Sequence, residues 1–466
     1  MTDQPSPLDR TLGSLLARRA SLSRLRHLSS PTPSAGVEAA DFSSNDYLSL
    51  SSSPDLQKAF LSRLGQNFPR LGSGGSRLLD GNSSLAESVE KTIAKFHGAE
   101  AALLFTSAFD ANVGLLSCAP QPGDVVLYDE LIHASIHDGL RFSRAGKRVA
   151  FRHDSVVSKP PAASNTEASA EECSLRADAG PPSLDVALGA LVAGDDGARV
   201  REGRMNVFIC VEGIYSMDGD VLSLPRLIAT MDKHLPAHNG YIIVDEAHSV
   251  GVLGPLGRGL VAESSPALQK RVWARVLGFG KAMGCAGGAV LCSGVVRNYL
   301  INYARTLIYT TAMSYPSLVA LDVVYDCVAG GQAEERRRRL TGLVKLAHDV
   351  LLAISRARVG DRRYIHVTED VARSPIIPVL TRRARSLAGF CQKRGFMVRP
   401  VVSPTVPEGK ERVRVCLHAE NTTKEVLGLG KAIEAWIEDQ FESEKWRRMG
   451  SIPARASIQN VNSAKL

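Results

Sequence analysis

The chain has 466 residues, of which 44% are hydrophobic and 22% are charged, and its formal net charge is +8. This composition excludes a disordered or fibrous protein and allows one large domain with at least one smaller domain. None of the eight cysteines forms a C-x-x-C pair, which excludes a zinc knuckle and a dithiol redox motif, and no apolar run approaches the roughly 20 residues of a membrane-spanning helix. We expect a folded intracellular protein with reduced thiols and no membrane span, whose positive charge suits an acidic small molecule rather than nucleic acid.

Residues 1–41 are predicted to form a basic arm and linker that precede the folded part of the chain. Between residues 10 and 30 the sequence is rich in Arg, Ser and Leu and lacks acidic residues, which is typical of a mitochondrial transit peptide. Two aspartates before this stretch are not typical of such a peptide.

Between residues 42 and 310, short apolar runs alternate with segments long enough for helices, which predicts a mostly parallel sheet between helices. A capping box at Ser84 is expected to begin a helix, and another helix is expected over 109–116. Residues 155–183 consist mainly of Ala, Ser, Pro, Glu and Asp, which predicts a disordered insertion. The expected strands are 101–105, 124–128, 205–211, 241–244, 275–277 and 288–292.

A smaller α/β domain is predicted over residues 311–445. Its expected strands are 375–379 and 413–417. A second capping box, beginning at Thr422, is expected to open the last helix. The inward face of that helix is predicted to hold Val426, Leu429, Ile433, Trp436 and Ile437.

The last residues, 446–466, are predicted to form a flexible tail. They end in Ala464-Lys465-Leu466, which matches the small-basic-leucine pattern of a peroxisomal address at a free C-terminus. We therefore expect the protein in the peroxisome, with the cytoplasm and the mitochondrion as alternatives. Fusing a fluorescent protein to each end in turn distinguishes the two addresses, because only a free C-terminus is read as the peroxisomal signal.

Lys281 lies in a glycine-rich turn shortly after one expected strand, and Asp245 directly follows another, with His248 three residues further on. Parallel strands bring their carboxyl ends to one ligand-binding edge of the sheet. A lysine amine there can form a Schiff base with pyridoxal 5′-phosphate (PLP), and a carboxylate beside the pyridine nitrogen makes the ring an electron sink. An aspartate after a strand is also typical of a helix cap or a metal ligand, but its pairing with Lys281 and His248 predicts a PLP site.

Two further turns fit the same cofactor. Residues 106–110 join a strand to a helix whose first backbone amides suit a phosphate group. His133 follows another strand and is placed to stack on the pyridine ring. His137 lies four residues after His133, but the intervening sequence has Ala134 where a zinc protease has glutamate, so we predict no metal site.

Seven motifs in this order resemble the α-oxoamine synthases, fold-type I PLP enzymes that condense an amino acid with an acyl-CoA and release CO2. The resemblance runs from about residue 42 to residue 440. It implies an α/β fold in which a large PLP-binding domain, 42–310, is followed by the smaller C-terminal domain. The motifs are Asn45-Asp46-Tyr47-Leu48, Gly72 to Arg77, His133-Ala134-Ser135, Glu212 to Asp220, Asp245-Glu246-Ala247-His248, Gly280-Lys281 and Ile308-Tyr309-Thr310-Thr311.

The resemblance implies catalytic and cofactor-binding roles for five matching positions. Lys281 is expected to bind PLP covalently and, once released, to take the α-proton of the amino acid. Asp245 is expected to pair with the pyridine nitrogen and His133 to stack on the ring. Ser216 and His248 are expected to contact the phenolic oxygen of the cofactor.

The resemblance also implies a phosphate site that two subunits share. Ser107, Ala108 and Phe109 are expected to bind the phosphate through backbone amides, and Thr311 is expected to reach it from the partner subunit of a homodimer. The family commonly has a hydroxyl residue three positions before the lysine, where this chain has Gly278. Glycine has no hydroxyl, so one hydrogen bond to the phosphate is expected to be missing in this chain.

For the substrates, the resemblance implies that Asn45 and Glu212 face the amino acid and that Arg414 binds its carboxylate through a bidentate guanidinium. Within the family, Ser216 to Asp220 and residues 404–407 are most similar to the members that condense L-alanine with pimeloyl-CoA, or another pimeloyl thioester, to 8-amino-7-oxononanoate for biotin. The alternative is a relative that uses glycine with acetyl-CoA, or a longer acyl-CoA. Arg24 or Arg26 is either a contact for the acyl carboxylate or an exposed arm residue.

Overall fold

The structure is a computed structural model that describes residues 5–22, 24–26, 28, 39–66, 70–157, 180–357 and 364–450, with side chains to residue 443. The chain divides into two compact units, Met1–Ala39 and Ala40–Leu466. Three segments lie outside the described residues: most of the linker (29–38), the middle of the expected insertion (158–179) and the C-terminal address (451–466). The expectations for them stay predictions.

The first unit contains one helix, α1 (Pro7–Ser21), among its described residues. The Ser6 hydroxyl caps it by accepting a hydrogen bond from the Asp9 backbone N–H, and a proline at the first position suits the fixed φ of a helix start. No side chain of α1 is buried, and Arg24 and Arg26 after it are exposed.

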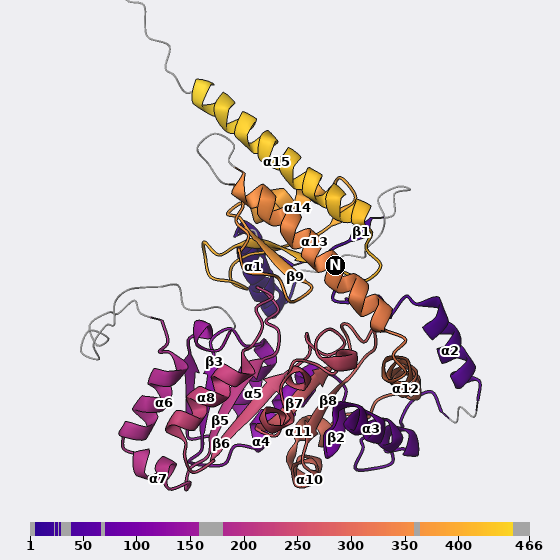
Figure 1. The fold of residues 1–466 in the computed structure, drawn as a ribbon, viewed down its shortest axis with the longest axis vertical. Helices are drawn as coiled ribbons and strands as arrows, with labels where there is room; N and C mark the ends of the chain where they lie inside the picture. Colours follow the sequence, from indigo (N-terminus) through magenta and orange to yellow (C-terminus); the bar gives the residue numbers. More distant parts are fainter. Residues whose placement is uncertain are drawn as a thin grey trace, which may run out of the picture. The chain divides into compact units, whose positions relative to one another are not determined.

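A seven-stranded sheet forms the centre of the second unit (Figure 1). Six strands run parallel, and β8 runs antiparallel between β2 and β7, so the sheet is mixed but mostly parallel. The strand order is β2 (Ala101–Phe105), β8 (Gly288–Cys292), β7 (Val272–Gly278), β6 (Gly240–Asp245), β5 (Val207–Glu212), β3 (Val125–Asp129) and β4 (Lys147–Phe151).

Helices cover both faces of this central sheet. Successive residues of each strand point to opposite faces, so the strand side chains divide between two cores. On one face Leu103 and Phe105 of β2 pack in a core with α4 (Ala108–Cys118), α5 (Ala134–Phe142), α10 (Gly294–Tyr303) and α11 (Arg305–Ile308). On the other face Ala102 and Leu104 join a larger core with α3 (Ser84–His97), α6 (Leu184–Ala193), α7 (Gly197–Arg201), α8 (Leu224–His234) and α12 (Tyr315–Ala329). The result is a three-layer α/β arrangement.

A second, antiparallel sheet follows towards the C-terminus, with the order β11 (Arg399–Val401), β12 (Arg412–Cys416) and β9 (Ile376–Leu380). Three helices accompany it: α13 (Glu334–Arg356), α14 (Ala384–Gln392) and α15 (Thr423–Gly450) (Figure 1). Near the start of the unit, β1 (Ala40–Asp41) pairs with β10 (Phe396–Met397), and the Phe42 carbonyl accepts a hydrogen bond from the Cys416 N–H. Residues just after the linker are therefore tied to this C-terminal sheet. Two short helices complete the unit, α2 (Pro54–Leu64) and α9 (Pro266–Gln269).

Most expected elements are present within one or two residues, and the differences have physical reasons. The helix cap lies at Ser83 rather than Ser84, since the Ser83 hydroxyl accepts from the Ala86 N–H. The capping box at Thr422 is confirmed, because Thr422 and Glu425 bond each other reciprocally. The five expected apolar residues of α15 are all buried.

The sequence analysis missed β4 and β11 and made β7 too short. β4 is an edge strand whose first three residues are exposed, so it lacks the apolar run that predicts a strand. The flanks of the expected insertion are ordered: Val157 is buried and forms a β-bridge with Leu222, and Ser183 caps α6. The predicted boundary at residues 310 and 311 stays a prediction.

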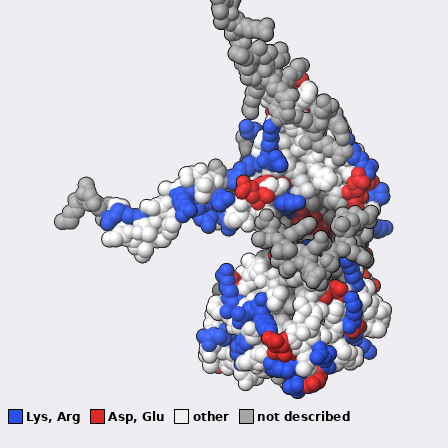
Figure 2. All heavy atoms as spheres, turned by 90° about the vertical axis from the view of Figure 1, so that its left-hand side faces the viewer, with Lys and Arg blue, Asp and Glu red and all other residues white. Residues whose placement is uncertain are grey.

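No helix among the described residues is both long and apolar enough to cross a membrane. On the face of the molecule that Figure 2 shows, Lys and Arg side chains of the second unit are interspersed with Asp and Glu. That face thus carries mixed charge.

Candidate active site

The carboxyl ends of the parallel strands meet at one edge of the central sheet, and the expected site residues lie there. Glu212 and Asp245 are the last residues of β5 and β6, and their Cα atoms are direct partners in the sheet register. Ser107 follows β2, His133 follows β3, and Lys281 follows β7. The topology therefore brings these five side chains to one edge.

Asp245 is only 6% exposed, and both of its carboxylate oxygens are held. Its Oδ1 accepts a hydrogen bond from the Ala247 N–H (2.9 Å), and its Oδ2 accepts one from Asn112 Nδ2 (2.6 Å). Each oxygen has a further lone pair. The carboxylate is thus fixed in orientation and able to accept one more donor.

Lys281 is partly buried beside these carboxylates. Burial lowers its pKa, while the charges of Asp245 and Glu212 oppose the shift and that of Arg414 adds to it. A lowered pKa increases the fraction of neutral amine, which is the nucleophilic form. The site therefore favours the state of Lys281 that can attack a carbonyl carbon.

Glu212 and His133 form a linked pair beside Lys281. The His133 backbone N–H donates to Glu212 Oε1 (2.5 Å), and the His133 Nδ1 shares a hydrogen bond with the Ser135 hydroxyl (2.8 Å). Burial, and then the charge of Asp245, raises the pKa of Glu212 well above its usual range. Burial lowers the pKa of His133, so its ring is neutral and suited to stacking on another flat ring.

His248 is buried and its orientation is set by Tyr47. Its Nδ1 shares a hydrogen bond of 2.8 Å with the Tyr47 hydroxyl, which also donates to Asn45 Oδ1 (3.2 Å). Burial, with the nearby charge of Lys281, lowers the pKa of His248 well below its usual range. The imidazole is therefore neutral.

Three residues expected to serve the substrate or cofactor are joined by direct contacts. Arg414, on β12 of the C-terminal sheet, donates from Nη2 to Asn45 Oδ1 (3.0 Å) and from Nη1 to the Ser216 carbonyl (3.2 Å). Arg414 also influences the pKa of both Lys281 and His248. The C-terminal sheet thus supplies a cation to the site.

The N-terminus of α4 provides an anion-binding group. Ser107 is its N-cap, and its hydroxyl both accepts from the Asp110 N–H (3.0 Å) and donates to the Asp110 carboxylate (2.7 Å). The first N–H groups of a helix, here those of Ala108 and Phe109, have no acceptor within the helix. Phe109 is 42% exposed and its ring meets the His133 ring edge to face at 6.3 Å.

These groups fit PLP by the chemistry of their donors and acceptors. The fixed carboxylate of Asp245 suits a protonated pyridine nitrogen, the neutral ring of His133 suits a flat aromatic ring, and the amides of α4 suit a phosphate. The amine of Lys281 lies among them. No group of three or more His, Cys, Asp or Glu in the described part of the chain is arranged to hold a metal ion.

Gly278 is tightly enclosed at the end of β7. A Cβ atom added there would lie 2.8 Å from the Ala247 Cβ and 3.3 Å from the Ala108 Cβ. A hydroxyl side chain therefore has no room at this position unless Ala247 shifts. The difference from the family pattern is built into the packing of this chain.

Thr311 is exposed and lies in the segment after α11. It lines a small pocket with Arg77 and Thr106. The Ala312 N–H donates to the Gly75 carbonyl (2.9 Å), so this segment pairs with the glycine-rich loop. These contacts lie within one chain and leave the contribution to a partner subunit as a prediction.

Several residues that the sequence analysis did not single out support the site. Asn112 holds Asp245, and Tyr47 holds His248. Tyr47 could have been predicted from the sequence, because it lies in the same motif as Asn45. Asn112, in the middle of α4, carried no sequence signal.

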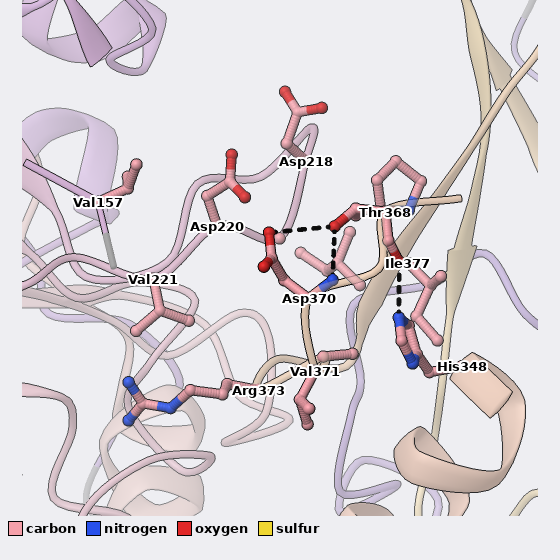
Figure 3. A pocket seen from close by; sticks show the side chains of 14 residues that line it. Val157, Asp218, Asp220, Val221, His348, Thr368, Asp370, Val371, Arg373 and Ile377 are labelled. Carbon is pink, nitrogen blue, oxygen red and sulfur yellow. Dashed lines mark hydrogen bonds between the residues drawn. The ribbon is translucent and has the colours of Figure 1, made fainter. Parts of the chain in front are cut away.

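A separate pocket lies beside the site residues, and none of the expected residues lines it. Asp218, Asp220 and Val221 form part of its wall, and Thr368, residues 370–373 and His348 form another part (Figure 3). Within it the Thr368 carbonyl bonds His348 Nε2 (3.0 Å).

Residues 37–433 match the family model for aminotransferase class I and II. The chain is 44% identical to the 8-amino-7-oxononanoate synthase of Emericella nidulans over 96% of this chain and all of that protein. It is 34% identical to the aminoacyl transferase sphA of Aspergillus fumigatus, over 90% of this chain and 85% of that protein. Serine palmitoyltransferase from S. paucimobilis, solved with PLP and myriocin, has the same fold, with a TM-score of 0.72 over 93% of this chain and 98% of that chain at 23% identity.

Replacing Gly278 by Ala should lower the thermal unfolding temperature, because the added Cβ overpacks against Ala247, at a cost of about 1–3 kcal/mol. Gly280→Ala is the matched control, since its nearest neighbour would be the Cys285 carbonyl oxygen at 3.6 Å, an ordinary contact. Differential scanning calorimetry of both variants compares the two positions. Equal unfolding temperatures would show that the space around Gly278 is not tight.

Proposed function

Because this chain belongs to the aminotransferase class I and II family and, within it, to the PLP-dependent α-oxoamine synthases, we propose that it condenses L-alanine with pimeloyl-CoA, or an equivalent pimeloyl thioester, to 8-amino-7-oxononanoate, CoA and CO2. The observation that carries the choice of substrates is the 44% identity to an 8-amino-7-oxononanoate synthase over the full length of that protein. The site geometry supports the chemistry.

The cofactor, when bound, supplies an electron sink for the bond changes at the α-carbon of the amino acid. Asp245 holds a proton at the pyridine nitrogen by ion pairing, because its carboxylate is buried and fixed by Asn112 and the Ala247 N–H. His133 offers its neutral ring as a stacking surface. The α4 amides bind the phosphate.

The amino acid is held from the side of the C-terminal sheet. Arg414 binds the carboxylate through its planar guanidinium, which Asn45 and the Ser216 carbonyl orient. Lys281, whose pKa is lowered, would supply the amine that holds the cofactor, and its Nζ would accept the α-proton of the amino acid. Burial raises the pKa of Glu212, which favours the protonated carboxyl and with it a hydrogen-bond donor for a substrate oxygen.

A longer acyl thioester is the second candidate substrate. It rests on the family, because an aminoacyl transferase named sphA, at 34% identity, stands beside the 8-amino-7-oxononanoate synthases among the relatives, so more than one acyl transfer is represented there. Both candidates keep the same roles for Lys281, Asp245 and Arg414. They differ only in the amino acid and the acyl chain.

The substrate assignment is tested by a matrix assay. CoA release by the purified enzyme should be fastest with L-alanine and pimeloyl-CoA, compared with glycine or L-serine and with acetyl-CoA or palmitoyl-CoA. Lys281→Ala is the control, and it should lose essentially all turnover because both the covalent link and the proton acceptor disappear. A higher kcat/KM for serine with palmitoyl-CoA would replace the biotin-type reaction by the second candidate.

The enzyme is further proposed to act as a homodimer in which Thr311 serves the site of the partner. The segment of Thr311 and the loop paired with it expose large apolar side chains, with Tyr309 72% and Leu79 77% exposed. Such a surface is suited to burial against a second copy. The phosphate of the partner site would then receive one hydroxyl from across the interface.

Subunit mixing tests this arrangement. Thr311→Ala should weaken PLP binding by about tenfold, since a hydrogen bond to a charged group contributes about 1.5 kcal/mol or more. Co-expression with Lys281→Ala should give hybrid dimers in which each subunit carries one of the two substitutions. If Thr311 acts across the interface, one of the two sites in such a dimer contains both native residues, so tight PLP binding and turnover should return to a fraction of the sites. Hybrids without any recovery, or a fully active monomer in light scattering, would contradict the shared site.

A further inference from the structure

His153 is a largely buried histidine whose hydrogen bonds go to Asp129 and Asp220, not to the residues expected to hold the cofactor. It lies in a short 3-10 helix after β4, and its side chain is 11% exposed. Its Nδ1 bonds Asp129 Oδ2 (2.8 Å) and its Nε2 bonds Asp220 Oδ2 (3.3 Å). Its ring packs against Tyr215 at a centroid distance of 4.3 Å and 77°.

Through Asp129, His153 is connected to the turn that ends at His133. Asp129 Oδ1 accepts from the Leu131 N–H (2.8 Å), which shapes this turn. Asp129 Oδ2 also accepts from the Tyr215 hydroxyl (2.9 Å), and the Tyr215 oxygen in turn accepts from the Glu212 N–H (3.3 Å). The cluster thus continues to the Glu212 that binds the His133 backbone.

Through Asp220, His153 is connected to the segment 214–221, which folds back on itself and is called the 214–221 hairpin below. Ile214 and Val221 form a β-bridge at its base. The Tyr215 N–H donates to the Asp220 carbonyl (3.0 Å) and the Gly219 N–H to the Tyr215 carbonyl (2.9 Å). The hairpin carries Ser216, whose carbonyl accepts from Arg414.

The opposite contacts of the hairpin come from the C-terminal sheet and the residues before it. Arg412 forms an ion pair with Asp218, and the Ser374 hydroxyl donates to the Gly219 carbonyl (2.9 Å). Figure 3 shows Asp218 and Asp220 on the hairpin beside the segment that carries Asp370 and Arg373. The hairpin is therefore held by His153 of the central-sheet layer and by Arg412 of the C-terminal sheet.

We propose that His153 is a positioning residue that fixes the 214–221 hairpin, and through Ser216 the guanidinium of Arg414, in the orientation that binds the amino-acid carboxylate. This inference rests on the proposed function for the role of Arg414. Burial alone would lower the pKa of His153, but the hydrogen bonds to Asp129 and Asp220 raise it to about 10. The imidazole is therefore protonated at neutral pH and donates from both nitrogens, one to each carboxylate.

Loss of this contact should act on binding of the amino acid more than on the chemical step. Lys281 and Asp245 have no direct contact with His153 in the bonds described, whereas Ser216 lies on the hairpin that His153 holds. An interaction that binds ground state and transition state alike changes KM and leaves kcat. His153→Gln removes the charge and keeps a hydrogen-bonding side chain of similar length.

The experiment compares the PLP-bound wild type with His153→Gln in two measurements. Hydrogen–deuterium exchange, without substrate, should be faster at the amides of residues 214–221 in the variant. Steady-state kinetics should give a KM for the amino acid raised by about tenfold, with kcat and the KM for the acyl thioester changed by less than about threefold. His234→Gln is the matched control. His234 is the last residue of α8 and also bonds a carboxylate, that of Asp185 (2.8 Å), which is not part of the hairpin.

Asp220→Asn tests the same contact from the other side in case His153→Gln does not fold. This variant should show the same faster hydrogen–deuterium exchange at 214–221 and the same rise in the KM for the amino acid. The double variant with His153→Gln should show less than the sum of the two single effects, because both substitutions act on one contact and the two amides can bond each other. Unchanged exchange at 214–221, or a loss of kcat at constant amino-acid KM, would overturn the proposal. The exchange measurement needs no substrate, so it is independent of the substrate assignment; the kinetics use whichever amino acid the wild type accepts.

Discussion

The pairing of two buried carboxylates beside Lys281 is the constraint on which the site depends. The parallel pairing of β5 and β6 makes Glu212 and Asp245 direct neighbours in the register, at a sheet edge where both are buried. Two buried like charges are costly unless a proton or a cation compensates them. The raised pKa of Glu212 reduces this cost, because it favours the neutral, protonated carboxyl beside the Asp245 carboxylate.

The remaining contacts hold flat or charged groups around this centre. Asn112 fixes Asp245 from α4, and Tyr47 fixes His248 from the segment after β1. Arg414 reaches the same place from the C-terminal sheet, whose strand β12 also contributes Arg412 to the 214–221 hairpin. The two sheets are therefore connected through the residues that are expected to hold the substrate.

Sequence reasoning found the residues that end strands, because a strand followed by a polar residue or a glycine leaves a local pattern. Asp245, Glu212 and Lys281 were predicted in this way, and parallel pairing brings them together. β4 was missed because its exposed edge carries Lys147 and Arg148 instead of an apolar run. The antiparallel direction of β8 depends on pairing with distant strands, which no local pattern reports.

The supporting residues were harder to predict than the site residues. Asn112 bonds Asp245, 133 positions away in the chain, and His153 bonds Asp220, 67 positions away, so neither contact has a local signature. The lack of space at Gly278 likewise arises from Ala247, which belongs to the neighbouring strand end. The family resemblance names the residues expected to touch cofactor and substrate, whereas the packing around them is seen only in the structure.

The covalent attachment of PLP to Lys281 is the most direct test of this account. Borohydride reduction of the purified enzyme, followed by proteolysis and mass spectrometry, should place the reduced cofactor on the peptide that contains Lys281 and on no other. The amine of Lys281 is the one that burial among Asp245 and Glu212 prepares for this reaction. Reduced cofactor on a different lysine, with Lys281 unmodified, would contradict the assignment of the site.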